Sequence, residues 1–142
     1  MKTNHLHDVW SGPDNSRLVS KQFSFRLPVH LAAKIAALGD MYPQKNRTQL
    51  VSDLLTAAMD NFEVNLPFEK GQGDTTENDY YAKLHAEHEG YEHEQAYMIT
   101  GARSRFRHLT NKYYKELEKE LGNETPEDIY GELWLSEAEF VK

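Results

Sequence analysis

Three side chains that can each form several hydrogen bonds alternate with large apolar ones in KQFSFRLP, residues 21–28. Gln22, Ser24 and Arg26 supply an amide, a hydroxyl and a guanidinium group at every second position. In a β-strand this spacing places all three groups on one face. Amide and guanidinium groups form paired hydrogen bonds to planar partners, and base edges in the DNA major groove are such partners. The chemistry that this face offers is base recognition, with Arg suited to guanine and Gln to adenine.

The element that would position these groups is a strand with one polar and one apolar face. Phe23, Phe25 and Leu27 face the other way, and Pro28 ends the strand where a helix can begin. The turn signals of a hairpin are absent on both sides, so no partner strand is predicted within the chain. Because unpaired backbone groups are costly when buried, we expect the same strand of a second copy to pair with it, antiparallel across a two-fold axis. The alternative is an edge strand of a small α+β fold.

Two amphipathic helices are predicted to follow at once. The first covers residues 29–41, and Pro43 stops its continuation. The second opens at Asn46, the N-cap of a capping box completed by Gln49, and it closes at residues 65–67. Their apolar faces and that of the strand predict a core shared between two copies. It comprises Phe23, Phe25, Leu27, Leu31, Ile35, Leu38, Leu50, Val51, Leu54, Leu55 and Phe62.

The chain resembles the ribbon-helix-helix repressors of the Arc, MetJ and CopG type in the order of its segments, which are KQFSFRLP, a helix, a short loop and NRTQLVSDLL. The resemblance covers about residues 20–64 and implies an intertwined homodimer that regulates transcription by binding specific DNA sequences. In that family the ribbon's outward residues read bases, and the N-terminus of the second helix holds a backbone phosphate. The residues predicted to read bases are Gln22, Ser24 and Arg26, and those predicted to bind phosphate are Lys21, Asn46, Arg47 and Thr48. Members often carry a glycine shortly before the second helix, where this chain has Gln44 and Lys45.

Charge divides the chain into two parts with different expected roles. Residues 1–68 carry seven Lys/Arg against six Asp/Glu, a net of +1, whereas residues 69–142 carry nine against seventeen, a net of −8. Because DNA repels an acidic surface, the DNA-binding role is assigned to the first part. The domains predicted are a flexible arm at 1–19, a ribbon-helix-helix domain at 20–68, a linker at 69–78 and an acidic, tyrosine-rich helical domain at 79–142. The predicted fold class is therefore mainly α.

The acidic part is predicted to contain three helical stretches. The first covers residues 79–99, the second covers residues 103–121 and ends at Gly122, and the third begins with Thr125 as N-cap and Pro126 in the first turn. Tyrosines recur through this part at helical spacing. They are predicted to be either core residues or the contact surface for a protein partner.

Two polar clusters in the acidic part leave alternatives open. His85, His88 and His93 lie among glutamates, as in a metal site or on a solvated helix face; the zinc-hydrolase spacing HExxH is absent, and no metal is predicted. The second cluster, residues 103–112, is rich in Arg and Lys. It could contact phosphate or pair with the acidic stretch at residues 87–94.

Composition bounds the remaining function classes. The chain has no cysteine, no glycine-rich phosphate loop and no serine in a nucleophile elbow, so neither an enzyme nor a cofactor is predicted. No apolar run has the length of a membrane span or signal-peptide core, which favours a cytoplasmic protein that does not bind membranes. The expected partners are double-stranded DNA and a second copy. The alternative function is an antitoxin-like or other adaptor whose residues 79–142 bind a protein.

Overall fold

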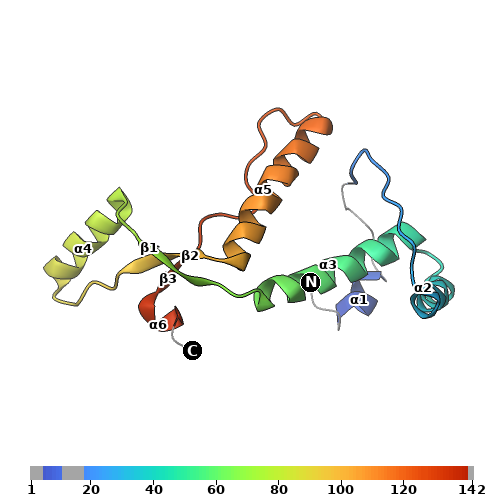
Figure 1. Cartoon of the computed structure of the whole chain (residues 1–142), viewed down its shortest axis with the longest axis horizontal. Coiled ribbons are helices and arrows are strands. Elements are labelled where there is room, and N and C mark those ends of the chain that lie inside the picture. The colour runs from blue at the N-terminus through green and yellow to red at the C-terminus, as the bar shows by residue number, and fades with distance from the viewer. Residues whose placement is uncertain (1–4, 11–17, 141–142) are drawn as a thin grey trace. The chain divides into compact units, whose positions relative to one another are not determined.

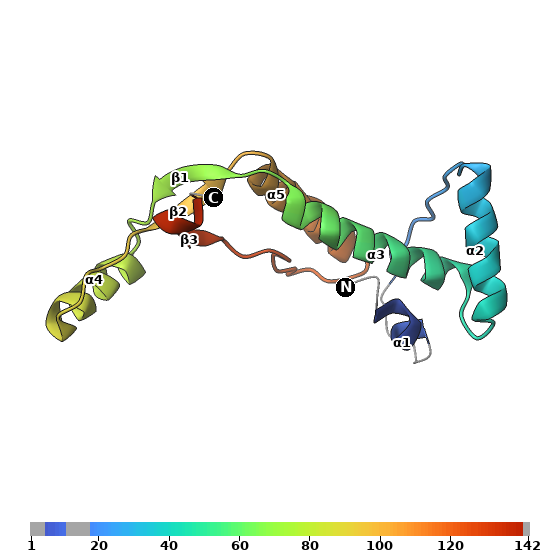
Figure 2. The same cartoon turned by 90° about the horizontal axis from the view of Figure 1, so that it is seen from below.

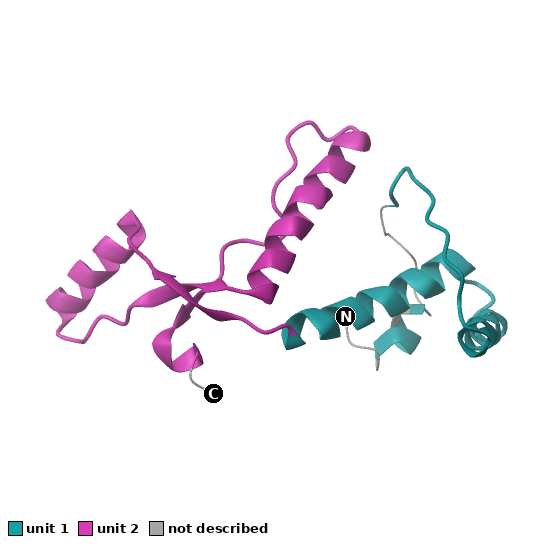
Figure 3. Ribbon diagram, viewed as in Figure 1, with its two compact units in different colours: residues 1–65 teal, residues 66–142 magenta. Residues whose placement is uncertain are grey.

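The computed structural model describes residues 5–10 and 18–140 and divides the chain into two compact units (Figures 1 and 3). Unit 1 comprises residues 1–65 and is helical, whereas unit 2 comprises residues 66–142 and combines helices with a small antiparallel sheet. The fold class is therefore mixed α/β, and the prediction of a purely helical C-terminal domain is wrong. None of the helices in the described ranges is long and apolar enough to cross a membrane.

The two helices predicted in unit 1 are confirmed. Helix α2 spans Val29–Met41 and helix α3 spans Arg47–Asn65. Asn46 caps α3 as the capping-box pattern predicts, because its Oδ1 accepts a hydrogen bond from the backbone N–H of Gln49 at 2.8 Å. The helical period and the cap together determined these two elements.

A short additional helix, α1 at Leu6–Trp10, lies beside α3 (Figures 1 and 2). Leu6 and Trp10 are buried against Leu50 and Ala57 of α3. The indole Nε1 of Trp10 donates a hydrogen bond to Oδ2 of the buried Asp53 at 2.6 Å. The prediction of a flexible arm is wrong for these residues, because two side chains one helical turn apart suffice to cover a face of α3. Residues 11–17 of that arm lie outside the described residues.

Helix α3 carries apolar side chains on two separate faces. Leu50 and Ala57 share the face that α1 and α2 cover. Val51, Leu55 and Phe62 lie ~100° further round the helix, because each residue adds ~100° of rotation. Leu55 and Phe62 are 54% and 56% exposed. The sequence predicted one broad face shared between two copies, whereas the chain's own helices cover half of it.

Unit 2 is built on a three-stranded antiparallel sheet in the order β1-β2-β3. The strands are β1 at Glu69–Gly73, β2 at Ala96–Thr100 and β3 at Trp134–Ser136. The helices are α4 at Glu77–Glu89, α5 at Ala102–Glu120 and α6 at Glu137–Phe140. Helix α4 connects β1 to β2 and projects beyond the sheet, and α5 follows directly from β2 (Figures 1 and 2).

The predicted linker at residues 69–78 is an edge strand and a turn. Glycine-rich polar sequence favoured a flexible connection, but Gly71 serves close packing instead. A Cβ atom there would lie 2.8 Å from Cγ2 of Thr100 and 2.9 Å from the carbonyl oxygen of Met98. Because only glycine allows this approach, β1 can pair with β2 despite its lack of aliphatic side chains. A register irregularity between Lys70 and Gly73 accompanies it.

The turn after β1 fixes the start of α4. Asp74 accepts a hydrogen bond from the backbone N–H of Thr76 at 2.8 Å. Hydrogen bonds from the Thr76 side chain and backbone hold the pKa of the exposed Asp74 carboxyl below its ordinary value. Gln95 Nε2 donates to the Asp74 carbonyl at 2.9 Å, which ties this turn to the segment entering β2.

Of the three helical stretches predicted in unit 2, only the second is confirmed. Helix α5 matches its predicted bounds to within one residue at each end, and Gly122 follows it with a φ of 96°. The stretch at 79–99 is helical only as far as Glu89, because Gly90 ends α4 in the left-handed region (φ 80°) and the chain then enters β2. The stretch from Thr125 is wrong. Asn111 exchanges two hydrogen bonds, of 2.9 and 2.8 Å, with the backbone of Tyr130 and so holds that segment in a non-helical conformation along α5.

The hydrogen bond between Trp10 and Asp53 predicts how α1 contributes to stability. Trp10→Phe removes the indole donor and leaves a buried carboxylate oxygen without it. We expect the free energy of unfolding to fall by about 1–3 kcal/mol, measured by urea denaturation at one fixed protein concentration. Asp8→Asn, an exposed change on the same helix, is the control and should stay within about 0.5 kcal/mol. Equal stability of Trp10→Phe and wild type would show that α1 does not hold α3.

Candidate nucleic-acid interface

Residues 21–28, predicted to be a strand, form neither a helix nor a strand within the single chain and lead directly into α2 (Figure 1). Gln22, Ser24 and Arg26 are all exposed. The strands that the described residues do form belong to unit 2. The pairing predicted for this segment involves a second copy and stays a prediction.

The apolar side of the same segment is equally exposed. Phe23, Phe25 and Leu27 are 64%, 75% and 46% exposed in the single chain. Large apolar side chains gathered on one surface typically mark a contact with another molecule. In the single chain, both the polar and the apolar residues of the alternation are therefore exposed.

A groove of ≈ 920 Å³ brings part of the predicted site together. One wall is the segment before α2, with Lys21, Gln22 and Ser24, and the other is the first turns of α3, with Arg47 and Thr48. Phe23, Phe25, Val51, Ser52 and Leu55 complete the lining, together with residues 18–20. The predicted base-reading and phosphate-binding groups therefore adjoin one groove, although Arg26 and Asn46 do not line it.

The N-terminus of α3 has the donors that an anion requires. The side-chain Oδ1 of Asn46 accepts a hydrogen bond from the backbone N–H of Gln49, and its backbone carbonyl accepts one from the N–H of Leu50 at 3.2 Å. The N–H groups of Arg47 and Thr48 have no acceptor within the helix, because the first turn lacks a preceding carbonyl. These N–H groups and the positive end of the helix dipole favour a phosphate.

Charge is distributed along α3 in a way that suits an anion at its start. Arg47 stands in the first turn, and two half-buried acids, Asp60 and Glu63, stand in the last two turns of the helix. At 1.5 Å per residue, Asp60 lies about 20 Å along the axis from Arg47. Asp53, which lies between them, is buried and bonded to Trp10. The end of α3 that adjoins the groove is therefore its basic end.

The loop before α3, where family members often carry glycine, is anchored by side chains that sequence reasoning missed. Gln44 Nε2 donates to the carbonyl oxygen of Trp10 at 3.2 Å. The N–H of Lys45 bonds to the Tyr42 carbonyl at 3.0 Å, closing the turn. The four-residue spacing of Leu6 and Trp10 was the signal that could have revealed this support.

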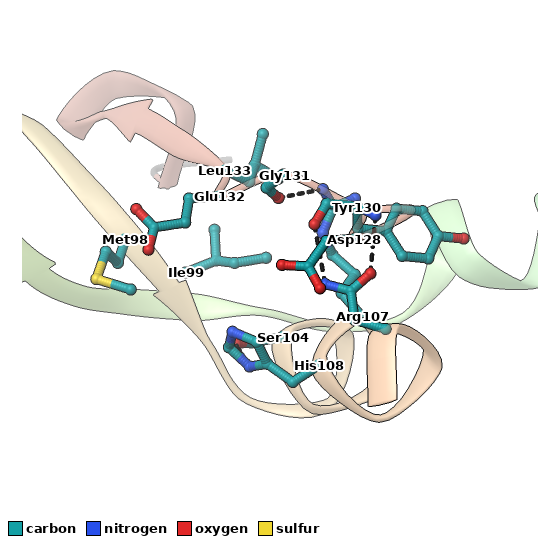
Figure 4. Close-up of a pocket in the computed structure, with 11 residues that line it drawn as sticks. Met98, Ile99, Ser104, Arg107, His108, Asp128, Tyr130, Gly131, Glu132 and Leu133 are labelled. Atoms are coloured by element: carbon teal, nitrogen blue, oxygen red, sulfur yellow. Dashed lines mark hydrogen bonds between the residues drawn. The ribbon is translucent and has the colours of Figure 1, made fainter. Parts of the chain in front are cut away.

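A second, smaller site lies in unit 2 as a pocket of ≈ 190 Å³ between β2, α5 and the segment that follows α5 (Figure 4). Ser104 Oγ lies 3.4 Å from Nδ1 of His108, while Asp128 Oδ1 binds Nζ of Lys115 at 2.8 Å. Arg107 donates to the carbonyl of Gly131 at 3.0 Å. The bonds of Lys115 and Arg107 attach residues 128–133 to α5, whereas the Ser104–His108 contact lies within the helix, so these polar groups have a structural role.

The histidines that suggested a metal site have other neighbours. Nε2 of His93 lies 2.8 Å from Oδ1 of the buried Asp79, which also approaches Nζ of Lys83 at 3.6 Å. The ring of His85 meets that of Tyr91 edge-on. Within the part of the chain whose placement is described, no three His, Cys, Asp or Glu side chains are grouped so as to hold a metal ion.

Two arginines of the basic cluster contact aromatic rings and a carbonyl within unit 2. Arg103 Nε donates to the carbonyl of Leu66 at 3.1 Å, and its guanidinium lies 4.3 Å from the centre of the Phe68 ring. The guanidinium of Arg107 lies 4.5 Å from the Tyr130 ring centre. These contacts fasten α5 to the rest of unit 2, a role that neither sequence-based alternative included.

No protein-family model, curated protein or solved structure matches this chain. What the chain does must therefore follow from its own residues and their geometry.

The cap of α3 gives a direct test of the phosphate-binding end. Asn46→Ala removes the acceptor of the Gln49 N–H, and we expect a loss of about 0.5–2 kcal/mol in the free energy of unfolding. Asn46→Ser is the matched control, since serine caps about as well and should keep most of the stability. Thermal denaturation followed by circular dichroism measures both variants. If Asn46→Ala melted with wild type, the cap would not order this helix start.

Proposed function

We propose that the chain is a cytoplasmic, homodimeric ribbon-helix-helix repressor that binds specific DNA sequences. The observation that carries the proposal is the segment at residues 21–28. Its hydrogen-bonding side chains alternate in sequence with exposed phenylalanines, and it has no strand partner in the described chain. A second copy would supply the missing strand partner and would cover the exposed phenylalanines.

Pairing two copies of the segment satisfies its backbone and covers its apolar side. Antiparallel strands exchange N–H···O=C bonds across the two-fold axis. Phe23 and Phe25 of each copy would then face the bare side of α3, where Leu55 and Phe62 stand. Burying an exposed Phe or Leu side chain contributes roughly 1.5–3 kcal/mol. Eight such side chains from two copies can offset an association cost of about 4–15 kcal/mol.

The paired ribbon presents six side chains to the DNA. A two-stranded ribbon fits the major groove, where Arg26 is suited to guanine O6 and N7 and Gln22 to adenine N6 and N7. Ser24 donates or accepts according to the base. Arg47 and Thr48 at the start of α3 lie in the same groove as Gln22, so phosphate contacts can fix the ribbon's register.

A second candidate function is that of an adaptor, supported by exposed aromatic side chains on α4. Tyr80, Tyr81 and Leu84 are exposed on that helix, and tyrosine is enriched at protein-binding hot spots. Unit 2 folds as a compact unit with its own sheet, unlike an antitoxin tail that orders only on binding. This argues for a folded docking module over a disordered one.

The adaptor function makes a separate prediction. We expect a neighbouring gene to encode a small basic protein that arrests growth and that the full chain neutralises. Tyr80→Ala/Tyr81→Ala should abolish neutralisation and leave DNA binding intact, measured by growth rescue and by gel shift. Lack of such a gene, or full rescue by the double variant, would remove this candidate.

Selection of duplexes from a random pool tests base reading. Wild type should enrich a palindromic motif, and the Gln22/Ser24/Arg26 triple alanine should not. Arg26→Ala alone should cost about 1–3 kcal/mol of binding free energy and relax one base pair per half-site. Lys34→Ala removes the same charge from an exposed position on α2 and should keep the motif. Equal enrichment by wild type and triple alanine would contradict base reading by the ribbon.

A further inference from the structure

Helix α5 of unit 2 carries an apolar groove of ≈ 420 Å³ that stands open. Leu109 and Tyr113 at its centre are 41% and 54% exposed. Thr110 adds little polarity, because its Oγ1 donates to the carbonyl of Phe106 at 2.7 Å. The full lining is Phe106, Leu109, Thr110, Tyr113, Tyr114 and Leu117.

The chain's own C-terminal segment occupies a different side of α5. Arg107 and Asn111 hold Gly131 and Tyr130 there through hydrogen bonds of 2.8–3.0 Å. At ~100° per residue, these two positions lie ~100–140° round the helix from Phe106. The groove therefore opens to a side that these bonds leave bare.

Two opposite charges flank the groove on its other side. Arg105 and Glu116 are eleven residues apart, about three turns, so they differ by only ~20° around the helix. Both side chains are exposed. In the described part of the chain neither has a hydrogen bond or an ion pair. A cation and an anion thus stand unpaired on one flank.

The pattern is symmetric about the middle of the helix. Arg105 and Glu116 lie equally far from the point between Thr110 and Asn111, and the two central groove residues, Leu109 and Tyr113, are centred within one residue of it. A two-fold axis through this point brings the groove onto its own copy, antiparallel. The same axis sets each Arg105 opposite the partner copy's glutamate at position 116. A surface that complements itself in this way is suited to an isologous contact.

We propose that the α5 face binds the α5 face of a second copy, antiparallel, with Leu109 and Tyr113 at the centre. The apolar contact supplies most of the affinity, because exposed ion pairs add little free energy. The two Arg105–Glu116 pairs select the antiparallel orientation, because a parallel arrangement would not place opposite charges together. Lys112 lies further out on this flank, with its Nζ 5.3 Å from the centre of its own Tyr113 ring. All these residues belong to unit 2, so the contact is independent of the ribbon and gives each chain a second self-interface.

Cysteine cross-linking with a short bismaleimide tests the contact in the full chain, which has no cysteine of its own. A bismaleimide is needed because flanking positions of two packed helices lie about 8–10 Å apart, too far for a direct disulfide. Arg105→Cys and Glu116→Cys are prepared separately, one with a size tag, and treated with the cross-linker alone or mixed. The mixed sample should form a covalent dimer of one chain of each kind. Either variant alone should form no covalent dimer, because identical positions lie about 16 Å apart along antiparallel helices.

Two controls and two contrary outcomes complete the experiment. His108→Cys lies on the far side of α5 from the groove and should not cross-link to Glu116→Cys. Leu109→Asp added to both chains should abolish the mixed dimer. Covalent dimers of Arg105→Cys alone would mean parallel pairing, and no cross-link in any sample would mean that another partner covers the groove. Either of these two results overturns the proposal, and neither bears on DNA binding by unit 1.

Discussion

Helix α3 has more apolar surface than one neighbouring helix can cover, and this constraint shapes unit 1. One face, around Leu50, is buried under α1 and α2. There the indole Nε1 of Trp10 donates a hydrogen bond to Asp53 Oδ2 at 2.6 Å. The other face, with Leu55 and Phe62, is left bare. The segment before α2 adds the exposed Phe23 and Phe25, which line a groove together with Leu55. In the described residues of the single chain this face stays exposed, and it is the face that the proposed second copy would cover.

The two units divide the chemistry between them. In unit 1, polar groups that can bind bases and phosphate adjoin one groove at the basic end of α3. In unit 2, Arg107 and Asn111 are used to attach the C-terminal segment to α5. Its exposed features are apolar and aromatic, which suits contacts between proteins. DNA binding in unit 1 and self-association through unit 2 are compatible roles for one chain.

Elements with a strong period and a clear cap could be predicted from the sequence, and elements held by single contacts could not. Helices α2, α3 and α5 show helical spacing, and Asn46 marks the start of α3. Helix α1 is too short to show a period, and burial of Trp10 depends on Asp53, 43 residues away. Gly71 suggested flexibility, but it allows close strand contact. The residue types of the candidate site and the Asn46 cap could be predicted from the sequence. The groove could not, because it depends on how residues 18–25 pack beside α3.

The pairing of residues 21–28 with the same segment of a second copy is the central claim, and isotope-filtered nuclear Overhauser spectroscopy tests it most directly. Labelled and unlabelled full-length chains are mixed, refolded together and examined for contacts between the two kinds of chain. The account predicts antiparallel cross-strand contacts in which Gln22 of one copy lies near residue 26 of the other and the Ser24 backbones lie opposite each other. Contacts within single chains only, at a concentration where the protein sediments as a dimer, would contradict it.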